Sequence, residues 1–304
     1  YMPIFEEALD AYGLPLELRY LPIIESALNP SAVSRAGASG LWQFMIGTGK
    51  IYGLESNSLV DERRDPIKAT WAAARYLKEM YDIYGDWNLV IAAYNCGPGT
   101  INKAIRRANG ETDYWKIYNY LPKETRGYVP AFIAANYVMT YYCDHNICPM
   151  ETNIPASTDT VQVNKNLHFE QIADLCNVPL DQIKSLNPQY KKQMIPGDSK
   201  PYTLRLPIDA ISTFIDKQDT IYTHRADELF RNRKTVAVKD ITPATRKTTS
   251  AVAGKGNLTY YTIKSGDTLS TIARKYGVTI KDIQRWNGMS NTKIAAGKRL
   301  KIYK

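Results

Sequence analysis

The chain has 304 residues, of which 44% are hydrophobic and 23% are charged, a composition typical of soluble globular protein with room for two or three domains. No run of about 18 uninterrupted apolar residues occurs, so we expect no membrane-spanning helix in this sequence. The net charge of +9 is uneven: residues 1–150 carry 14 Lys and Arg against 16 Asp and Glu, whereas residues 151–304 carry 25 against 14.

Residues 1–150 show helical periodicity throughout. A helix is predicted from Pro66 to Tyr84, because Asp65 is a good N-cap, Pro66 suits the first helical position and Gly85 suits the end. Another helix is predicted after Asp86, and further helices are predicted over 101–108 and 129–140. No alternating strand pattern interrupts them, so we predict one α domain over residues 1–150.

After residue 150 an internal repeat appears at an offset of 100 residues. The segment 169–189 matches 269–289, and each copy is flanked by two alternating segments that predict strands. The repeat therefore predicts two small α+β modules of βααβ type. We predict the first module with an extension over 151–234, a flexible linker over 235–257 and the second module over 258–304.

The chain opens at Tyr1 without an initiator methionine, so we expect it to be part of a longer chain in which a preceding segment could anchor the protein to a membrane. The four cysteines and three histidines lack zinc-site spacing, so we expect no metal and no cofactor. Cys143 and Cys148 are close enough in sequence to bridge in an oxidising compartment, and the sequence leaves this pairing open.

Glu25 lies in the stretch PIIESALNPSAVSRAGASGLWQF (residues 22–44), among isoleucine and leucine side chains. Pro22 suits the first turn of a helix, which would place Glu25 in that turn and Pro30 just beyond its end. A helix N-terminus favours the ionised carboxylate by about 0.3–1 kcal/mol, whereas complete burial raises a carboxyl pKa by up to about 3–5 units. In an apolar site Glu25 would therefore stay protonated near neutral pH and could act as a general acid. The alternative is an ordinary carboxylate interacting with the helix dipole.

Three motifs follow one another along the chain. The first runs from Glu25 through SRAGASGLWQFMIGTGKIYGL, the second is AYNCGPG and the third is ETRGYVP. Across roughly residues 12–140 they resemble lytic murein transglycosylases of glycoside hydrolase family 23, and the repeated C-terminal modules are most similar to the membrane-bound D type of that family. The resemblance implies a mainly α, lysozyme-like catalytic domain that cleaves the MurNAc-β-1,4-GlcNAc bond of peptidoglycan without water and leaves 1,6-anhydro-MurNAc ends. One carboxylate then suffices, because the C6 hydroxyl of the sugar replaces the second group that other glycosidases need.

The resemblance also implies roles for individual residues. Glu25 would protonate the leaving oxygen and then remove the C6 hydroxyl proton. Tyr94 would orient Glu25 through its hydroxyl, and Asn95 would contact sugar. Ser34 would hydrogen-bond near the acetamido group, although a hydroxyl that only satisfies a local turn is the alternative. Cleft-lining roles are implied for Gln43, Met45 and Tyr128.

Other residues in these motifs are given structural roles. Trp42 and Phe44 are expected in the core. Glu124, in ETRGYVP, is not expected to be a second catalytic acid. Cys96 is expected to act as a small hydrophobe.

Residues 260–303 resemble a LysM domain through SGDTLSTIA, the WN pair at 286–287 and AGKRLKI. LysM domains bind N-acetylglucosamine polymers in a shallow groove between two loops. The resemblance implies glycan-binding positions at Gly266, Asp267, Thr268 and Leu269 in one loop and at Ile294 and Gly297 in the other. The copy at 161–207 has NKNLHF in place of KSGDTL and resembles a degenerate LysM, for which both glycan binding and packing against the catalytic domain stay open.

The charge of the second module bears on the partner. Residues 258–304 carry ten Lys and Arg against two Asp and Glu. This excess of positive charge favours binding to anionic envelope polymers. No nucleic-acid fold signature accompanies this charge, so we expect no nucleic acid. We expect a monomer that binds peptidoglycan glycan strands in the bacterial periplasm or cell envelope. A goose-type lysozyme-like hydrolase and an inactive peptidoglycan-binding protein are the open alternatives.

Overall fold

The structure is a computed structural model that describes residues 1–148, 154–155, 157–231, 258–264, 267–287, 289, 294 and 297–303. The chain divides into two compact units, Tyr1–Pro243 and Ala244–Lys304. Within the first unit we distinguish the α domain, residues 1–148, from the first module, residues 157–231; the second module comprises residues 258–303. The linker predicted over 235–257 lies outside the described residues.

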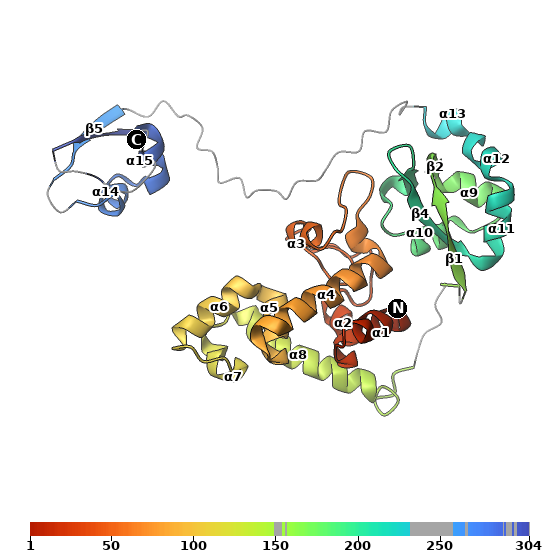
Figure 1. The fold of residues 1–304 in the computed structure, drawn as a ribbon, viewed down its shortest axis with the longest axis horizontal. Helices are drawn as coiled ribbons and strands as arrows, with labels where there is room; N and C mark the ends of the chain where they lie inside the picture. Colours follow the sequence, from red (N-terminus) through yellow and green to blue (C-terminus); the bar gives the residue numbers. More distant parts are fainter. Residues whose placement is uncertain are drawn as a thin grey trace. The chain divides into compact units, whose positions relative to one another are not determined.

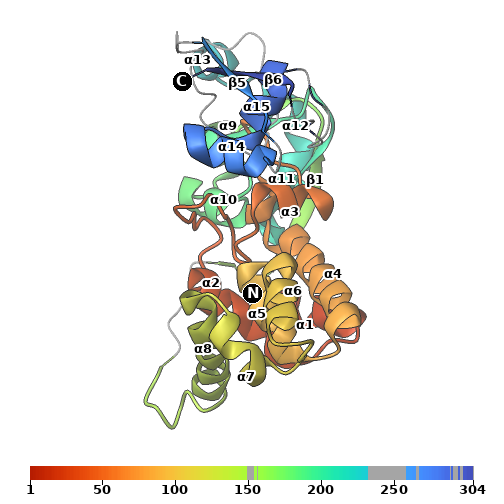
Figure 2. The same cartoon turned by 90° about the vertical axis from the view of Figure 1, so that its left-hand side faces the viewer.

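The α domain is built from helices joined by turns and by two longer connections over residues 27–45 and 52–65 (Figures 1 and 2). Its α-helices are α1 (Met2–Ala11), α2 (Leu21–Ser26), α3 (Ile46–Ile51), α4 (Pro66–Tyr84), α5 (Trp87–Cys96), α6 (Pro98–Arg107), α7 (Tyr114–Ile117) and α8 (Lys123–Thr140). Helix α5 contacts both α4 and α8, and α8 also contacts α2. Within the described residues, no helix is both long enough and apolar enough to cross a bilayer.

The predicted capping signals are confirmed in α4 and α5. The Asp65 carboxylate accepts hydrogen bonds from the backbone N–H groups of Ile67 and Lys68, and Gly85 ends α4 in the left-handed conformation. The Asp86 carboxylate caps α5 in the same way. These local signals fix two helices that form the centre of the domain.

Helix α8 begins at Lys123, six residues before the predicted start, and continues through Pro130. A proline inside a helix leaves the carbonyl four residues earlier without its N–H partner. Here that carbonyl belongs to Arg126, and it accepts a hydrogen bond of 2.9 Å from the buried Tyr114 hydroxyl. Tyr114 therefore satisfies the group that Pro130 leaves free, and the helix does not have to end.

The core of the α domain includes the aromatic residues predicted there. Trp42 is fully buried, and its indole N–H donates to the Thr70 hydroxyl at 2.9 Å. Phe44 is also buried, and Cys96 packs against the same core as a half-buried residue. Cys143 and Cys148 are free and exposed.

The first module has the predicted βααβ order with additions. Its strands and helices are β1 (Thr158–Val163), β2 (Asn166–His168), α9 (Phe169–Cys176), α10 (Leu180–Leu186), β3 (Met194–Pro196) and β4 (Tyr202–Pro207), followed by α11 (Ile208–Asp216), α12 (Gln218–Thr223) and α13 (Ala226–Leu229). Strands β1 and β4 pair antiparallel. A second antiparallel pair, β2 with β3, joins the two loops that precede α9 and follow α10. The extension therefore folds as three short helices, of which α11 and α12 contact α9.

The second module repeats the βααβ core with β5 (Leu258–Thr262), α14 (Leu269–Tyr276), α15 (Ile280–Asn287) and β6 (Arg299–Tyr303). The repeated asparagines make the same hydrogen bonds in both modules. The Asn187 side chain donates to the carbonyls of Ile183 and Arg205 and accepts from the Arg205 N–H. Asn287 does the same with Ile283 and Lys301. The predicted fold class, a mainly α domain followed by small βααβ modules, is confirmed.

The α domain and the first module share a hydrophobic core. Leu59 and Val60 of the α domain are buried among first-module side chains, including Phe169 and Tyr190. Backbone hydrogen bonds join Asp61 N–H to the Gln189 carbonyl at 2.8 Å and Lys191 N–H to the Leu59 carbonyl at 2.7 Å. The first module is therefore packed onto the α domain.

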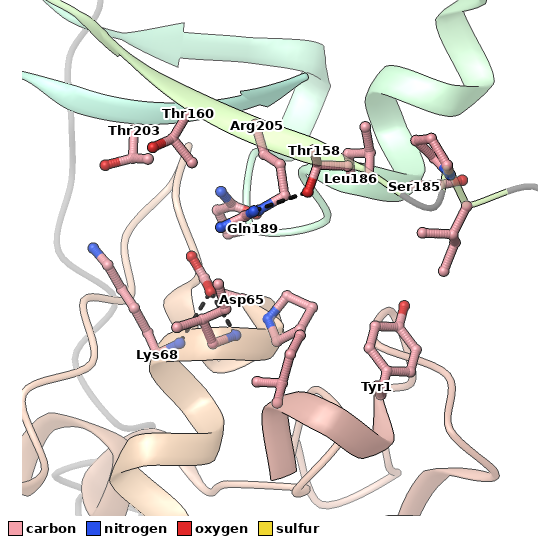
Figure 3. A pocket seen from close by; sticks show the side chains of 15 residues that line it. Tyr1, Asp65, Lys68, Thr158, Thr160, Ser185, Leu186, Gln189, Thr203 and Arg205 are labelled. Carbon is pink, nitrogen blue, oxygen red and sulfur yellow. Dashed lines mark hydrogen bonds between the residues drawn. The ribbon is translucent and has the colours of Figure 1, made fainter. Parts of the chain in front are cut away.

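Away from these contacts the same junction is open. A cavity of about 370 Å³ lies there (Figure 3). Asp65 and Lys68 line it from the α domain, and Thr158, Gln189 and Arg205 line it from the first module. The Arg205 guanidinium donates to the Thr158 hydroxyl at 3.0 Å. The tight contact between the two parts is thus concentrated in residues 55–64 of the α domain.

Candidate active site

Glu25 lies in the last turn of α2, which corrects the prediction that it lies in the first turn. Helix α2 begins at Leu21, directly after a 3₁₀ turn over Leu16–Tyr20, and ends at Ser26. Ala27 and Leu28 take left-handed backbone conformations, with φ of 51° and 60°, so the helix ends well before Pro30. The helix end and burial were expected to have opposite effects on the negative charge of Glu25. This opposition is absent, because the C-terminal end of a helix also disfavours a negative charge.

The Glu25 carboxylate accepts a hydrogen bond from the hydroxyl of Tyr128 on α8. Burial raises the pKa of Glu25 to about 7; the Tyr128 hydrogen bond opposes this rise, and the charge of Glu124 adds to it. Glu124 itself is exposed at the start of α8. Glu25 can therefore hold a proton near neutral pH and also release it, as an acid that later serves as a base requires.

Tyr94 occupies a different place from the one the sequence implied. Its hydroxyl donates to the Trp42 carbonyl oxygen at 2.7 Å, so Tyr128, and not Tyr94, supplies the hydrogen bond to Glu25. Burial raises the pKa of Tyr94 well above its usual value, and the charge of Glu25 raises it further. Tyr94 is thus a neighbour of Glu25 whose bond holds the loop before α3.

Asn95, the next residue of α5, contacts α8. Its side-chain oxygen accepts from the Thr125 hydroxyl at 2.8 Å, and Thr125 is buried. Thr125 and Tyr128 are three residues apart on α8 and so share a face of that helix. The contact therefore ties the AYNCGPG motif to the helix that carries the Glu25 partner.

The 32–45 loop carries the remaining predicted substrate-binding residues. Ser34 is exposed, and its hydroxyl oxygen accepts from the Ala38 N–H at 3.0 Å, the local turn contact considered as the alternative. Gln43, with a φ of 48°, donates from its side-chain amide to the carbonyls of Ala32 and Gly40. Met45 is 45% exposed just before α3. Ser26, beside Glu25, donates to the Leu41 carbonyl at 2.9 Å and joins α2 to this loop.

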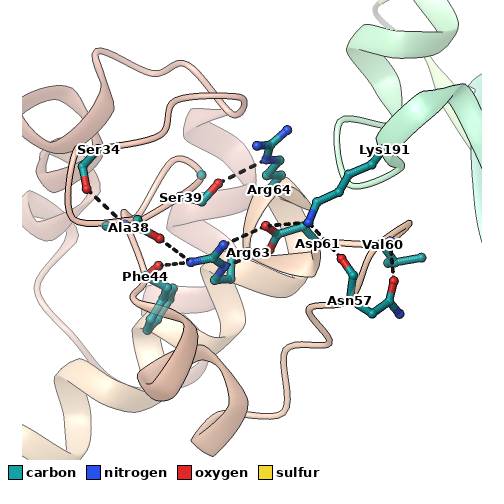
Figure 4. A network of polar contacts seen from close by, with 12 residues as sticks. Ser34, Ala38, Ser39, Phe44, Asn57, Val60, Asp61, Arg63, Arg64 and Lys191 are labelled. Carbon is teal, nitrogen blue, oxygen red and sulfur yellow. Dashed lines mark hydrogen bonds and ion pairs between the residues drawn. The ribbon is translucent and has the colours of Figure 1, made fainter. Parts of the chain in front are cut away.

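A buried ion pair that the sequence analysis missed holds the 32–45 loop in place (Figure 4). Arg63 donates to both oxygens of Asp61, at 2.8 and 2.7 Å, and also to the carbonyls of Gly37 and Phe44. Burial opposes the charge on Asp61, but the hydrogen bonds and charge of Arg63 outweigh it and hold the pKa of Asp61 below its usual value. A side chain at Gly40 would place its Cβ 1.7 Å from the Arg63 carbonyl oxygen. Gly40 is therefore required for the loop to approach the turn that carries Arg63.

The first module contributes to the same network. The Lys191 ammonium donates to the Asn57 carbonyl at 2.9 Å and lies 3.6 Å from the Asp61 carboxylate. Tyr202 and Lys200 both contact the carboxylate of Glu55, at 2.8 and 2.7 Å. The loop that carries Ser34 and Gln43 is thus supported from outside the α domain.

In the second module, the positions implied for glycan binding lie in two loops, and Gly266 falls outside the described residues. Asp267 accepts from the Tyr261 hydroxyl and the Lys264 N–H, both at 2.8 Å, which fixes the first loop. Thr268 is exposed at the start of α14, whereas Leu269 is buried. Ile294 is half-buried against the core, and Gly297, with a φ of 85°, donates its N–H to the Ile263 carbonyl.

The matching positions of the first module are closed. Leu167, Phe169 and Met194, which correspond to Asp267, Leu269 and Ile294, are each at most 1% exposed. The β2–β3 pairing joins the two loops that would have to form a groove. A Cβ at Gly197 would lie 2.2 Å from the carbonyl oxygen of Lys165 in the facing loop.

Comparison with known proteins matches three family models to the chain. The transglycosylase SLT domain matches residues 2–117, the LysM-like domain of lytic transglycosylase MltD matches 157–223, and the LysM domain matches 261–302. The chain is 33% identical over 294 residues to membrane-bound lytic murein transglycosylase D of Escherichia coli K12, covering 95% of this chain and 60% of that protein. It is also 33% identical over 124 residues to the soluble lytic murein transglycosylase of the same organism, covering 39% of this chain and 19% of that protein.

Among solved structures, the 70 kDa soluble lytic transglycosylase of Escherichia coli aligns with 47% of this chain and 24% of its own, with a TM-score of 0.41 and 29% identity. The match to the D-type relative covers 95% of this chain, and the chain spans 60% of the relative's length. An SLT domain followed by two LysM-type domains accounts for most of the described residues. The chain therefore carries an SLT domain and two LysM-type domains, and along 95% of its length it is similar to a membrane-bound lytic murein transglycosylase D.

Proposed function

We propose that the α domain cleaves the MurNAc-β-1,4-GlcNAc bond of peptidoglycan without water and leaves 1,6-anhydro-MurNAc ends. The observation that carries this proposal is the environment of Glu25. This carboxylate has a pKa of about 7, and Tyr128 donates a hydrogen bond to it. The membrane-bound lytic murein transglycosylase D relative supports the same substrate class.

The chemistry proceeds in two proton transfers through one residue. Protonated Glu25 gives its proton to the glycosidic oxygen as the bond from that oxygen to the anomeric carbon breaks. The resulting carboxylate then takes the proton of the MurNAc C6 hydroxyl as its oxygen bonds to the anomeric carbon. Glu25 ends the cycle protonated again. The reaction therefore needs no second carboxylate and consumes no water. The Tyr128 hydroxyl stabilises Glu25 in its charged state between the two steps.

We propose that six residues contact or position the glycan strand: Ser34, Gln43, Met45, Tyr94, Asn95 and Tyr128. Gln43 is held by two backbone carbonyls, and Ser34 keeps its hydroxyl proton available to a ligand while its oxygen accepts from Ala38. Asn95 keeps its side-chain amide available while its oxygen accepts from Thr125. Held donors of this kind suit the polar groups of a sugar.

The second module is proposed to bind the peptidoglycan wall through its two loops, at Gly266, Asp267, Thr268, Leu269, Ile294 and Gly297. Its excess of Lys and Arg would add attraction to anionic envelope polymers. The first module, whose matching positions are buried, is proposed to support the 32–45 loop instead. We place the protein in the bacterial cell envelope.

The test is mass spectrometry of muropeptides released from purified sacculi by the wild-type chain and by Glu25→Gln. We expect wild-type products with anhydro ends, each lighter by one water than the hydrolytic product, and at least a 100-fold loss for Glu25→Gln. Products with ordinary reducing ends would support a goose-type hydrolase. Binding without release, equal for both proteins, would support an inactive peptidoglycan-binding protein.

A further inference from the structure

A second cavity, of about 320 Å³, lies where the α domain meets the first module, and its lining is strongly basic. Four cationic side chains line it: Arg64 from the α domain and Lys184, Lys191 and Lys192 from the first module. Among the described residues that line this cavity there is no aspartate or glutamate. Figure 4 shows Arg64 and Lys191 reaching this region from the two sides of the junction.

The nearby carboxylates do not balance this charge. Lys184 pairs with Asp181 at 3.0 Å. Lys191 lies 3.6 Å from Asp61, but that carboxylate already accepts two hydrogen bonds from Arg63. Across the part of the chain that the structure describes, Arg64 and Lys192 have no carboxylate within ion-pair distance. The Arg64 side chain makes one hydrogen bond, to the Ser39 hydroxyl at 3.1 Å.

Two further observations describe this cluster: like charges crowd around Lys191, and the fold imposes the backbone conformation at Lys192. Burial lowers the pKa of Lys191, and the charges of Arg64 and Arg63 lower it further against the attraction of Asp61. Lys192 and the next residue, Gln193, both take left-handed backbone conformations, with φ of 58° and 55°. Such conformations are costly for residues other than glycine and persist where the surrounding fold imposes them.

The cavity adjoins the loop that we propose to hold the glycan strand. Ser31, directly before the 32–45 loop, lines the cavity, and Arg64 contacts Ser39 within that loop. The muramic acid units of peptidoglycan carry short peptides with free carboxylates. A strand held along this loop would bring such a peptide close to the cavity.

We propose that this basic cavity binds a carboxylate of the peptide stem, so that the protein prefers peptide-bearing strands over bare glycan. The proposal rests on the proposed function for the identity of the polymer. Arg64 and Lys192 supply the charge that is not already paired, and Lys184 and Lys191 complete the walls. The guanidinium group of Arg64 suits a carboxylate because its donors match the two oxygens.

The first experiment compares kcat/KM for peptide-bearing strands with that for strands stripped of peptide by an amidase. Lys192→Glu should lower the ratio of the two values by about three- to tenfold at low salt, and the effect should shrink in about 1 M NaCl. The matched control is Lys217→Glu, the same charge reversal at an exposed first-module position that does not line the cavity. It should leave the ratio unchanged.

The second experiment measures binding without turnover. The full chain with Glu25→Gln is titrated with a disaccharide peptide and with the same compound whose carboxylates are amidated. We expect the free acid to bind about three- to tenfold more tightly, and Lys192→Glu in the same background to remove the difference. Equal binding of the two compounds, or equal ratios for Lys192→Glu and Lys217→Glu, would overturn the proposal. Absence of anhydro products together with preserved discrimination in binding would instead count against the proposed function alone.

Discussion

The hydroxyl of Tyr128 donates a hydrogen bond to the carboxylate of Glu25 across 103 residues of sequence. Because a hydrogen bond to a carboxylate favours its ionised form, this contact limits how far burial raises the pKa of Glu25. Tyr128→Phe should therefore move the alkaline limb of the pH profile upward by about 0.5–1 unit, and activity should fall about tenfold as Glu25 loses its orientation.

The control for this prediction is Tyr94→Phe, which removes a hydroxyl bonded to the Trp42 carbonyl and not to Glu25. It should lower activity without the upward movement of the alkaline limb. The measurement is kcat/KM from pH 5 to pH 9. A limb that moves downward, or moves equally in both variants, would contradict the assigned hydrogen bond.

The pH dependence of the wild-type chain follows from the protonation of Glu25. Since the pKa of Glu25 is raised to about 7, the acid form needed for the first proton transfer dominates below pH 7. We expect kcat/KM to be nearly constant from pH 5.5 to 6.5 and to fall about tenfold per pH unit above pH 7.5. Binding to sacculi measured over the same range separates this effect from loss of substrate. A midpoint near the ordinary glutamate pKa would show that Glu25 is not held as an acid.

Glu25 should also make the fold less stable as the pH rises. A carboxyl whose pKa is raised on folding binds more protons in the native state than in the unfolded state, so the free energy of unfolding decreases between about pH 4.5 and pH 7. Glu25→Gln removes this dependence. Relative to wild type, the variant should gain about 1–3 kcal/mol at pH 8 and little at pH 5.

Urea unfolding followed by tryptophan fluorescence at the two pH values checks this, because four of the five tryptophans lie in the α domain. Glu17→Gln is the matched control, since Glu17 is exposed in the turn just before α2. Its effect should be the same at both pH values. A gain for Glu25→Gln that is equal at pH 5 and pH 8 would rule out a buried carboxylate as its cause.

The approach of the 32–45 loop to Arg63 can be tested with two glycines. Gly40→Ala places a methyl group 1.7 Å from the Arg63 carbonyl oxygen, at a φ of +90°. We expect a loss of about 2–4 kcal/mol in the free energy of unfolding, together with a raised KM, because the loop carries Ser34 and Gln43. Gly53→Ala has a similar φ of +83° but meets no atom within 4 Å, so it should cost only about 1–2 kcal/mol. Equal losses in urea unfolding would mean that backbone conformation alone, and not the close contact, sets the requirement.

The helices that the sequence predicted well are those whose signals are local. Helix α4 has its cap, its first-turn proline and its terminal glycine within its own segment. The start of α8 was not predictable, because the helix continues through Pro130 only where Tyr114, sixteen positions earlier, satisfies the freed carbonyl. The position of Glu25 within α2 was predicted wrongly, because the helix is short and ends in two consecutive left-handed residues.

The candidate site was predictable in its residue types and not in its contacts. Which tyrosine reaches Glu25 depends on how α8 packs against α2, and no local pattern encodes that packing. The Asp61–Arg63 pair lies between motifs and has no spacing that marks it, although two charged residues in a segment with buried neighbours were a signal. The β2–β3 pairing, which closes the first module, likewise arises from tertiary contacts between two loops.

Removing the second module should separate binding to the wall from cleavage of glycan. The second module carries the excess of positive charge and an exposed Thr268 in its first loop, whereas the first shares its core with Leu59 and Val60 of the α domain. A chain truncated after Arg231 should therefore lose most of its binding to insoluble sacculi and most of the salt dependence of that binding. Its kcat/KM on short soluble glycans should stay within about twofold of the full chain, because the support from Lys191 and Tyr202 is retained. Co-sedimentation with sacculi and product release from soluble glycans measure the two properties on the same preparation. An equal loss of both would mean that the second module takes part in cleavage, and unchanged binding would place the wall contact in the first unit.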